Sequence, residues 1–477
     1  MPLVVTLIDA IGPFLNPLRP EDEQVVLPYG LLTLASCVRE AFGQAVEVDV
    51  VNTAVEGRDR ASLAAILEKR HPDVVGVRGL QPYADRYFEA VVVARNAGAA
   101  LVLGGGPLAT TSPEAALVEG VDFVVIGEGE RTLVELLERY LAGRTLREVD
   151  GLAWREGGGV QRSRPRAWLE DLDRVPYPAY DLLDQEVYRK RLSYGYNHRR
   201  QGVLFTSRGC PYGCTFCVRL FGSRFRAQSP GRVVDELAWL VETQAITDFS
   251  IVDDTFNLDR SRVLAICAEL ARRGLAGRIR LYLVNGLRAD LVDEEVLDAL
   301  VTAGTVWVAF ALETVVPRLQ QVLGKQLDVG KAIAAIEAAA ERGMVVAYWG
   351  LVGIPGETLA EVDATLEALL TLPPAAIPML FHLKPFPGTA FTAVWTEHDF
   401  EESRYHDFLP LLRASPDYLP LLERWWRGIH GEDRLSAVVR ALWANHYTEE
   451  DIRSLFRAVY RAVAPARVEA LLARCRQ

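Results

Sequence analysis

Apolar runs typical of β-strands alternate with amphipathic helical stretches along most of this 477-residue chain. In the N-terminal third, five such runs are each followed by a helical pattern, which predicts βαβ units and a parallel sheet. Residues 1–142 are therefore expected to form an open, doubly wound α/β domain whose ligand lies beyond the carboxyl ends of the strands. The expected strands are 3–9, 46–51, 73–77, 100–105 and 122–127, and the helices begin near Gly30, Arg60, Ala84, Ser112 and Arg131.

A second alternation covers residues 203–390. Its six strand and helix repeats predict a partial (β/α)6 barrel, whose chemistry lies at the carboxyl ends of the strands. Between the two domains, residues 143–202 are expected to form a linker with a small hairpin that turns at Gly157–Gly159. The expected barrel strands are 203–207, 249–254, 280–285, 306–313, 345–353 and 378–386.

Residues 391–477 are predicted to form a helical C-terminal domain, with the first helical pattern over residues 402–414. Its aromatic and histidine side chains have two interpretations. Packing is the simpler one, and the alternative is a helical cap that helps to close a substrate pocket. These side chains are Trp425, Trp426, His430, Trp443 and His446.

Three of the six cysteines, Cys210, Cys214 and Cys217, lie within eight residues in the stretch RGCPYGCTFCVR. In a reducing cytoplasm such thiols are not expected to form disulfides. A structural zinc site would need a fourth Cys or His nearby, and the next histidine downstream is the remote His382. Three thiolates suit a four-iron four-sulfur cluster that leaves one iron open to a small molecule. The three cysteines are therefore predicted to hold such a cluster.

The spacing of these cysteines, with the aromatic Phe216 just before the last of them, resembles the signature of the radical S-adenosylmethionine (SAM) enzymes. This resemblance implies that SAM binds the open iron through its amino and carboxylate groups. It also implies an electron donor such as a flavodoxin or a ferredoxin.

The resemblance extends to the ends of three later strands, which would border SAM. The strand after the cysteine loop ends in a motif that holds the SAM amino group, matched here by Asp253–Asp254. The fourth strand ends in a polar residue facing the methionine carboxylate or ribose, matched by Glu313. The fifth carries a Gly-x-x-Gly-type stretch bordering the adenine, matched by Gly353, Ile354 and Gly356. For each polar residue the alternative is a solvated loop residue or a helix cap.

A doubly wound domain directly before such a barrel resembles the cobalamin-binding class of radical SAM enzymes. The supporting stretches are LPYGLLTLASCVRE (27–40), LGGGPLATTSPEAAL (103–117) and VIGEGERTLVELL (125–137), and the resemblance covers roughly residues 1–390. It implies a Rossmann-like cobalamin-binding domain; a nucleotide-binding Rossmann domain is the weaker alternative, because no GxGxxG motif is present. The strand-end residues expected to approach the cofactor are Gly104, Gly105, Gly106, Gly127, Glu128 and Gly129.

The known cobalamin signature Asp-x-His-x-x-Gly, which supplies a histidine to the cobalt, is absent. The only histidine before residue 198 is His71, which precedes a strand instead of following one. We therefore expect cobalamin without a protein histidine ligand. Arg78, directly after the third expected strand, is a candidate to face the cofactor, and its alternative is a surface or ion-paired arginine.

Charge and hydropathy exclude several classes of partner. The formal charge of -11 is spread along the chain without a basic block, which argues against nucleic acid. No apolar run approaches the roughly 20 residues of a membrane span, and the start MPLVVTLIDAIGPF lacks the basic residues of a secretory signal. A cytoplasmic monomer acting on a small-molecule substrate is expected.

The family chemistry implied by the resemblance is one-electron cleavage of SAM to a 5'-deoxyadenosyl radical, with cobalamin between the domains as a methyl carrier. We expect an enzyme that C-methylates a small-molecule or natural-product intermediate. A radical rearrangement or cyclisation on the same scaffold is the first alternative, and a non-catalytic cobalamin or iron–sulfur sensor is the second. Methylthiotransferase activity is disfavoured because that related group needs further cysteines in its N-terminal domain.

Overall fold

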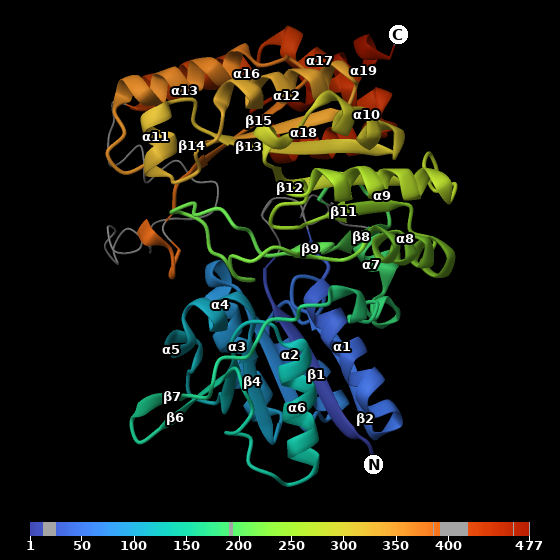
Figure 1. Cartoon of the computed structure of the whole chain (residues 1–477), viewed down its shortest axis with the longest axis vertical. Helices are drawn as coiled ribbons and strands as arrows, with labels where there is room; N and C mark the ends of the chain where they lie inside the picture. The colour runs from blue at the N-terminus through green and yellow to red at the C-terminus, as the bar shows by residue number, and fades with distance from the viewer. Residues whose placement is uncertain (13–24, 190–193, 385, 392–417, 461, 477) are drawn as a thin grey trace. The chain divides into compact units, whose positions relative to one another are not determined.

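The computed structural model describes residues 1–12, 25–189, 194–384, 386–391, 418–460 and 462–476, whose contacts form two compact units (Figure 1). Unit 1 contains the described residues within Met1–Leu15, Val25–Tyr188 and Val218–Ala227. Unit 2 contains those within Arg189–Cys217 and Gln228–Gln477. Unit 1 thus includes most of the expected linker and a segment that follows the last clustered cysteine. No helix within the described ranges is long and apolar enough to cross a membrane.

The sheet of unit 1 has the strand order β2-β1-β3-β4-β5-β6-β7. The first five strands in this order are parallel, as the sequence predicted, and the order reverses between β1 and β3. The expected hairpin is present as β6 and β7, but it pairs antiparallel with β5 and so extends this sheet. The strands are β1 (Leu3–Ala10), β2 (Val46–Asn52), β3 (Val74–Gly79), β4 (Leu101–Gly105), β5 (Phe123–Val125), β6 (Leu152–Glu156) and β7 (Gly159–Arg162).

Side chains of alternate strand residues face two helical layers, since successive residues of a strand point to opposite faces. Val5 and Leu7 of β1 pack with one layer, whereas Ile8 and Ala10 pack with the other. Both faces of the sheet are therefore buried, which is why its central strands are almost wholly apolar. The first layer is α1 (Tyr29–Phe42) and α6 (Glu130–Leu141), and the second is α2 (Arg60–Arg70), α3 (Ala84–Asn96), α4 (Gly106–Thr111) and α5 (Pro113–Ala116); α7 (Gln185–Arg189) follows.

The sheet of unit 2 is parallel throughout, with the order β15-β14-β13-β12-β11-β8. Within the described part of the chain, β8 and β15 lie at opposite edges and are not paired, so the barrel is partial, as predicted. The predicted α/β class is confirmed in both units. The strands are β8 (Gln201–Leu204), β11 (Asp248–Ile251), β12 (Arg280–Leu287), β13 (Thr305–Glu313), β14 (Val345–Val352) and β15 (Ile377–His382); β9 (Ser207–Arg208) and β10 (Arg226–Ala227) are two short strands outside both of these sheets.

Most helices between these strands begin at a capping side chain. Asp259, Asp293, Asp328 and Thr358 each accept a hydrogen bond from the third backbone amide of the following helix, as Ser229 does for α8. Such caps satisfy amides that the helix leaves unpaired, and they fix where each helix starts. The helices are α8 (Pro230–Gln244), α9 (Arg260–Arg272), α10 (Glu294–Thr302), α11 (Pro317–Val322), α12 (Val329–Glu341) and α13 (Leu359–Thr371).

The C-terminal helices α17, α18 and α19 pack against the amino-terminal halves of the barrel strands, including Trp307, Val345 and Ile377. Trp443 joins this core and Trp425 is buried, which favours the packing interpretation of both. Trp426 remains 38% exposed and lies against His430. The helical C-terminus is confirmed; the helix expected over 402–414 lies outside the described residues. The helices are α16 (Tyr418–Ile429), α17 (Glu432–Ala444), α18 (Glu449–Val459) and α19 (Pro465–Cys475).

Candidate functional site

The cysteine loop follows β9 in unit 2, and its first part is held by the residues that follow β11. Asp254 Oδ2 accepts a hydrogen bond from the amide of Gly209 at 2.9 Å. The hydroxyl of Thr255 lies 3.2 Å from the sulfur of Cys210. The loop therefore begins at the carboxyl edge of the barrel sheet, where the sequence placed it.

The second part of the loop packs against the end of α11. Thr215 donates its amide to the carbonyl of Leu323 at 2.8 Å and its hydroxyl to the carbonyl of Val322 at 3.0 Å. Gly324 has a φ of 62°, and a Cβ there would lie 2.8 Å from the carbonyl oxygen of Gly213. Glycine at 324 is thus required both by the backbone conformation and by the close approach of the loop.

Cys210 and Cys214 are half-buried and Cys217 is exposed. Within the described ranges, no three His, Cys, Asp or Glu side chains converge closely enough to hold one metal ion. A four-iron cluster binds each thiolate to a different iron, so its sulfur ligands need not converge on one point. A short loop with three thiols, anchored at both ends, is a donor set that fits such a cluster.

Asp253 and Asp254, which follow β11, have different surroundings. Asp253 is 2% exposed, and its carboxylate accepts hydrogen bonds from the amide and hydroxyl of Thr206 and from the hydroxyl of Ser207. Burial raises the pKa of Asp253, against the effect of the nearby Arg262 guanidinium and these hydrogen bonds. Asp254 is only partly buried. The carboxylate of Asp253 therefore fastens the chain at this edge of the sheet, and that of Asp254 lies beside the cysteine loop.

Glu313 is the last residue of β13, and its carboxylate is paired. Oε1 accepts a hydrogen bond from Lys325 Nζ at 2.7 Å, and both side chains are buried. Sequence reasoning did not single out Lys325. Its rarity was the available signal, because the chain has only five lysines among its 52 basic residues.

The Gly-x-x-Gly stretch after β14 forms a tight loop, with positive φ at Gly353 and Gly356. Ile354 is buried in an apolar cluster against which Phe216 of the cysteine loop packs, so the structure brings these two predicted residues together. The amide of Gly353 donates to Glu357 Oε1, and the hydroxyl of Tyr418 donates to the same oxygen at 3.1 Å. Burial raises the pKa of Glu357 to about 7.

Arg288, after β12, lies over the ring of Tyr212 in the cysteine loop, 3.8 Å from the ring centre. Its guanidinium forms an ion pair with Asp290 and donates to the carbonyl of Lys325. Asn285 donates to the backbone carbonyl of Asp253 at 2.9 Å. Arg288 thus braces the cysteine loop, and Asn285 holds the chain that follows β11.

In unit 1, Arg78 of β3 is paired with Asp9 of β1, with Nη1 and Oδ1 2.5 Å apart. The two strands are neighbours with Asp9 and Arg78 in register, at the point where the strand order reverses. Ligands of doubly wound sheets bind at this reversal. The Asp9 side chain is fully buried while that of Arg78 is 28% exposed. Arg78 is thus ion-paired and also lies at the edge where a ligand is predicted. The ion pair and a position facing the cofactor are therefore compatible.

The glycines after β4 have different roles. A Cβ on Gly104 would lie 2.2 Å from the hydroxyl of Tyr87, and one on Gly106 would lie 2.6 Å from the Arg78 side chain. A Cβ on Gly105 would meet no atom within 4 Å. Packing of the chain itself therefore requires glycine at 104 and 106, whereas Gly105 borders open space at the sheet edge.

Gly127, Glu128 and Gly129, which follow β5, contact other side chains of unit 1. Glu128 is buried and pairs with buried Arg226, with Oε1 and Nη1 2.9 Å apart. The Arg226 guanidinium also lies over the ring of Trp168, 5.2 Å from its centre. Gly127 is adjacent to the same ring, and Gly129 is adjacent to Leu34. This part of the predicted cofactor edge serves to dock the segment 218–227 onto unit 1.

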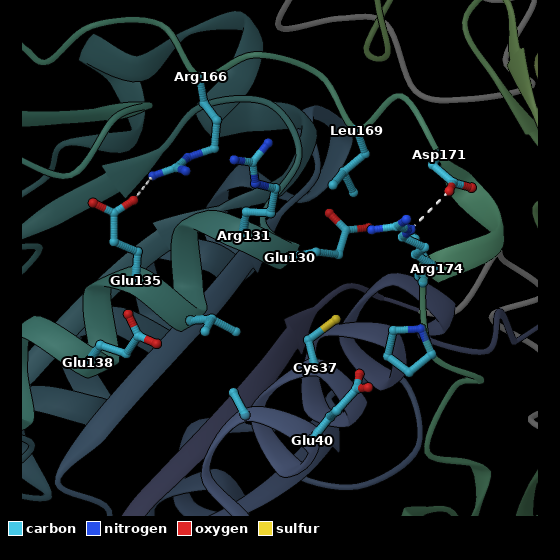
Figure 2. A pocket seen from close by; sticks show the side chains of 14 residues that line it. Cys37, Glu40, Glu130, Arg131, Glu135, Glu138, Arg166, Leu169, Asp171 and Arg174 are labelled. Carbon is cyan, nitrogen blue, oxygen red and sulfur yellow. Dashed lines mark hydrogen bonds and ion pairs between the residues drawn. The ribbon is translucent and has the colours of Figure 1, made fainter.

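A pocket of about 560 Å³ lies in unit 1, between α1, α6 and the segment 166–176 (Figure 2). Its walls are largely charged, and Arg166 pairs with Glu135 while Arg174 pairs with Asp171 at 3.0 Å. Its lining residues Glu130 and Arg131 directly follow the loop Gly127–Gly129, and the amide of Leu169 donates to Glu128 at 2.8 Å, so the pocket borders the end of that edge at β5.

Two stretches of the chain match known protein families. Residues 20–137 match the B12 binding domain, and residues 204–369 match the radical SAM superfamily. The uncharacterized methyltransferase PH0819 of Pyrococcus horikoshii is 32% identical over 345 residues, which cover 71% of this chain and 72% of that protein. The chain belongs to the cobalamin-dependent radical SAM enzymes.

Three further similarities were found, one to a curated relative and two to solved structures. An anaerobic magnesium-protoporphyrin IX monomethyl ester cyclase of Cereibacter sphaeroides is 26% identical over 366 residues, covering 74% of this chain and 58% of the cyclase. The radical SAM methyltransferase TsrM of Kitasatospora setae, whose structure holds tryptophan substrate and a SAM analogue, matches with a TM-score of 0.67 and 25% identity over 83% of this chain and 76% of TsrM. The structure of OxsB, at 17% identity, covers 99% of this chain with a TM-score of 0.67 and supports the fold.

The cofactors of this cobalamin-dependent radical SAM enzyme are a four-iron four-sulfur cluster, SAM and cobalamin. The residues present fit them. Three thiols on one anchored loop suit the cluster. In unit 1, buried Asp9 Oδ2 has no hydrogen-bond partner among the described atoms, and Gly105 faces open space at the same edge. His71 stands at the C-terminus of α2, ahead of β3, as the sequence predicted.

Proposed function

We propose that this enzyme C-methylates a small-molecule or natural-product intermediate. The observation that carries this proposal is the similarity to PH0819, an uncharacterized methyltransferase, at 32% identity over 71% of this chain. The structural similarity to TsrM, a methyltransferase described with tryptophan substrate, supports a small molecule as the methyl acceptor. The interpretation as a non-catalytic sensor is dropped, because the chain belongs to a family of enzymes.

In this proposal Cys210, Cys214 and Cys217 hold the cluster, and Asp254 and Glu313 face polar groups of SAM. Asp254 is the better candidate of the Asp253–Asp254 pair, since the carboxylate of Asp253 is committed to Thr206 and Ser207. The backbone from Gly353 to Gly356 borders the adenine. When bound, the three cofactors supply radical formation and methyl transfer, and the protein supplies position and exclusion of water.

For cobalamin, we propose that Arg78 faces the cofactor and that Gly105 lets it approach the backbone. A guanidinium has no lone pair for a metal, so Arg78 would occupy space next to the cobalt without coordinating it. The Glu128–Arg226 pair would act indirectly, by holding the loop Gly127–Gly129 in place.

The test is mass spectrometry of reactions with SAM that carries a labelled methyl group, using candidate substrates drawn from neighbouring genes and a reduced flavodoxin or ferredoxin as electron donor. Label in the product, absent with the Cys214→Ala variant, supports methylation. A product two hydrogens lighter than the substrate and without label contradicts it and supports cyclisation.

Cyclisation stays the second candidate because of the similarity to the anaerobic cyclase, of which this chain spans 58%. We propose a monomer as the working form, and sedimentation of the reconstituted enzyme tests this.

A further inference from the structure

A buried ion pair lies close to the cysteine loop in unit 2. Lys325 and Glu313 are joined at 2.7 Å, and each side chain is only 8% exposed. Glu313 adopts a φ of 67° at the end of β13, a conformation that residues other than glycine rarely take. The surrounding structure must therefore hold this pair in place.

The chain next to Lys325 touches the loop directly. The carbonyls of Val322 and Leu323 accept hydrogen bonds from Thr215, and Gly324 lies against Gly213. Cys214 lies between these two loop residues, so the Lys325 ammonium belongs to the charge environment of its sulfur.

A second pair, Arg288 with Asp290, completes this environment, and Arg288 donates to the carbonyl of Lys325 at 2.9 Å. Buried ion pairs add little net stability, because removing two charges from water costs about as much as their attraction returns. A pair of leucines or methionines could fill the same volume. A role in the chemistry of the loop explains the charges better than a role in stability.

We propose that the Lys325–Glu313 pair sets the reduction potential of the cluster held by Cys210, Cys214 and Cys217, with Lys325 raising it and Glu313 lowering it. Reduction adds one electron from a one-electron donor; no proton is taken up and no bond breaks. The reduced cluster carries one more negative charge than the oxidised one. A nearby ammonium therefore stabilises the reduced form relative to the oxidised form, and a nearby carboxylate destabilises the reduced form.

This inference rests on the cluster of the proposed function but not on its substrate. The test measures the midpoint potential of the cluster in anaerobically reconstituted, SAM-free protein, by electron paramagnetic resonance during redox titration. Lys325→Met should lower the potential and Glu313→Gln should raise it. Lys325→Arg keeps the charge and should stay close to the wild type.

Lys331→Met is the matched control, because Lys331 is a surface lysine on α12 whose side chain is 70% exposed. The midpoint potential of the cluster in Lys331→Met should equal that of the wild type. Shifts of the same sign in Lys325→Met and Glu313→Gln, or no shift in either with the cluster intact, would overturn the proposal. Normal shifts together with no methyl transfer would instead contradict only the proposed function. If Lys325→Met does not retain a cluster, the direction of the shift in Glu313→Gln still tests the sign of the effect.

Discussion

Arg78 on β3 donates a hydrogen bond to Asp9 on the adjacent strand β1, across the point where the strand order of unit 1 reverses. The Asp9 carboxyl is wholly buried, and its burial raises its pKa although Arg78 acts in the opposite direction. The pair therefore fixes a guanidinium at the edge of the sheet where a ligand of this fold binds.

The first prediction concerns cobalt coordination at that edge. Because Arg78 offers no lone pair and the sequence places no histidine after these strands, reduced cobalamin should show no axial nitrogen from the protein. Electron paramagnetic resonance of the reduced, loaded enzyme measures this directly. Nitrogen superhyperfine splitting that changes when the protein alone is labelled with nitrogen-15 would falsify the histidine-free arrangement.

The same pair predicts a coupled effect on stability. Arg78→Ala leaves the buried Asp9 without its partner, and breaking such a pair costs about 3 kcal/mol in the free energy of unfolding. The double variant Asp9→Asn/Arg78→Ala should recover part of this loss, since no buried charge remains. Chemical denaturation of the apo-protein gives both values, and Arg162→Ala on exposed β7 serves as the control. Equal stability of Arg78→Ala and the wild type would return Arg78 to a surface role.

A further prediction concerns the cluster itself. Reconstituted protein should carry about four irons and four sulfides per chain. Alanine at Cys210, Cys214 or Cys217 should abolish both the cluster and SAM cleavage, because each thiolate holds one iron. Cys475→Ala, in the last helix, should leave iron content unchanged. An intact cluster in Cys214→Ala would remove the basis of the site.

Asp253 and Asp254 should differ when they are neutralised. Asp254→Asn and Glu313→Gln should weaken SAM binding by about 1.5–3 kcal/mol with the cluster spectrum unchanged, because each loses a charge-assisted hydrogen bond. Asp253→Asn should instead lower the free energy of unfolding, since its carboxylate accepts three bonds within the fold. Calorimetry with SAM and denaturation measure the two effects, with exposed Glu337→Gln as the control. The reverse pattern would assign Asp253 to SAM.

The half-buried carboxyl of Glu357 predicts a pH dependence of stability. Its pKa is raised from 4.5 to about 7 in the folded protein, so the folded state holds the proton more tightly than the unfolded state. Protonated Glu357 makes its full contribution to the free energy of unfolding below pH 4.5. This contribution, roughly 2 kcal/mol for a partly exposed group, is lost as the pH rises to 7. Glu357→Gln should remove this loss between pH 5 and 8, and Glu341→Gln on the surface of α12 should not. If the free energy of unfolding changes with pH in the same way in Glu357→Gln and the wild type, this prediction is contradicted.

Local patterns in the sequence were sufficient to predict most helices and strands and to recognise the cysteine loop. The strand VWVAFALE and the spacing of Cys210, Cys214 and Cys217 could be recognised without distant contacts, because strand periodicity and ligand spacing are properties of neighbouring residues. The hairpin at Gly157–Gly159 was recognised for the same reason, but its pairing with β5 was not, since that pairing joins distant residues.

The sequence by itself determined two α/β domains, their order and the residue types that hold the cluster. Only the tertiary structure decided which charges meet: Arg78 with Asp9, Glu128 with Arg226, and Lys325 with Glu313. It also separated Asp253, enclosed by hydroxyls, from its neighbour Asp254 beside the loop. The physical reason is that burial and partner choice depend on elements far apart in the chain, so two adjacent aspartates with the same local sequence can have opposite roles.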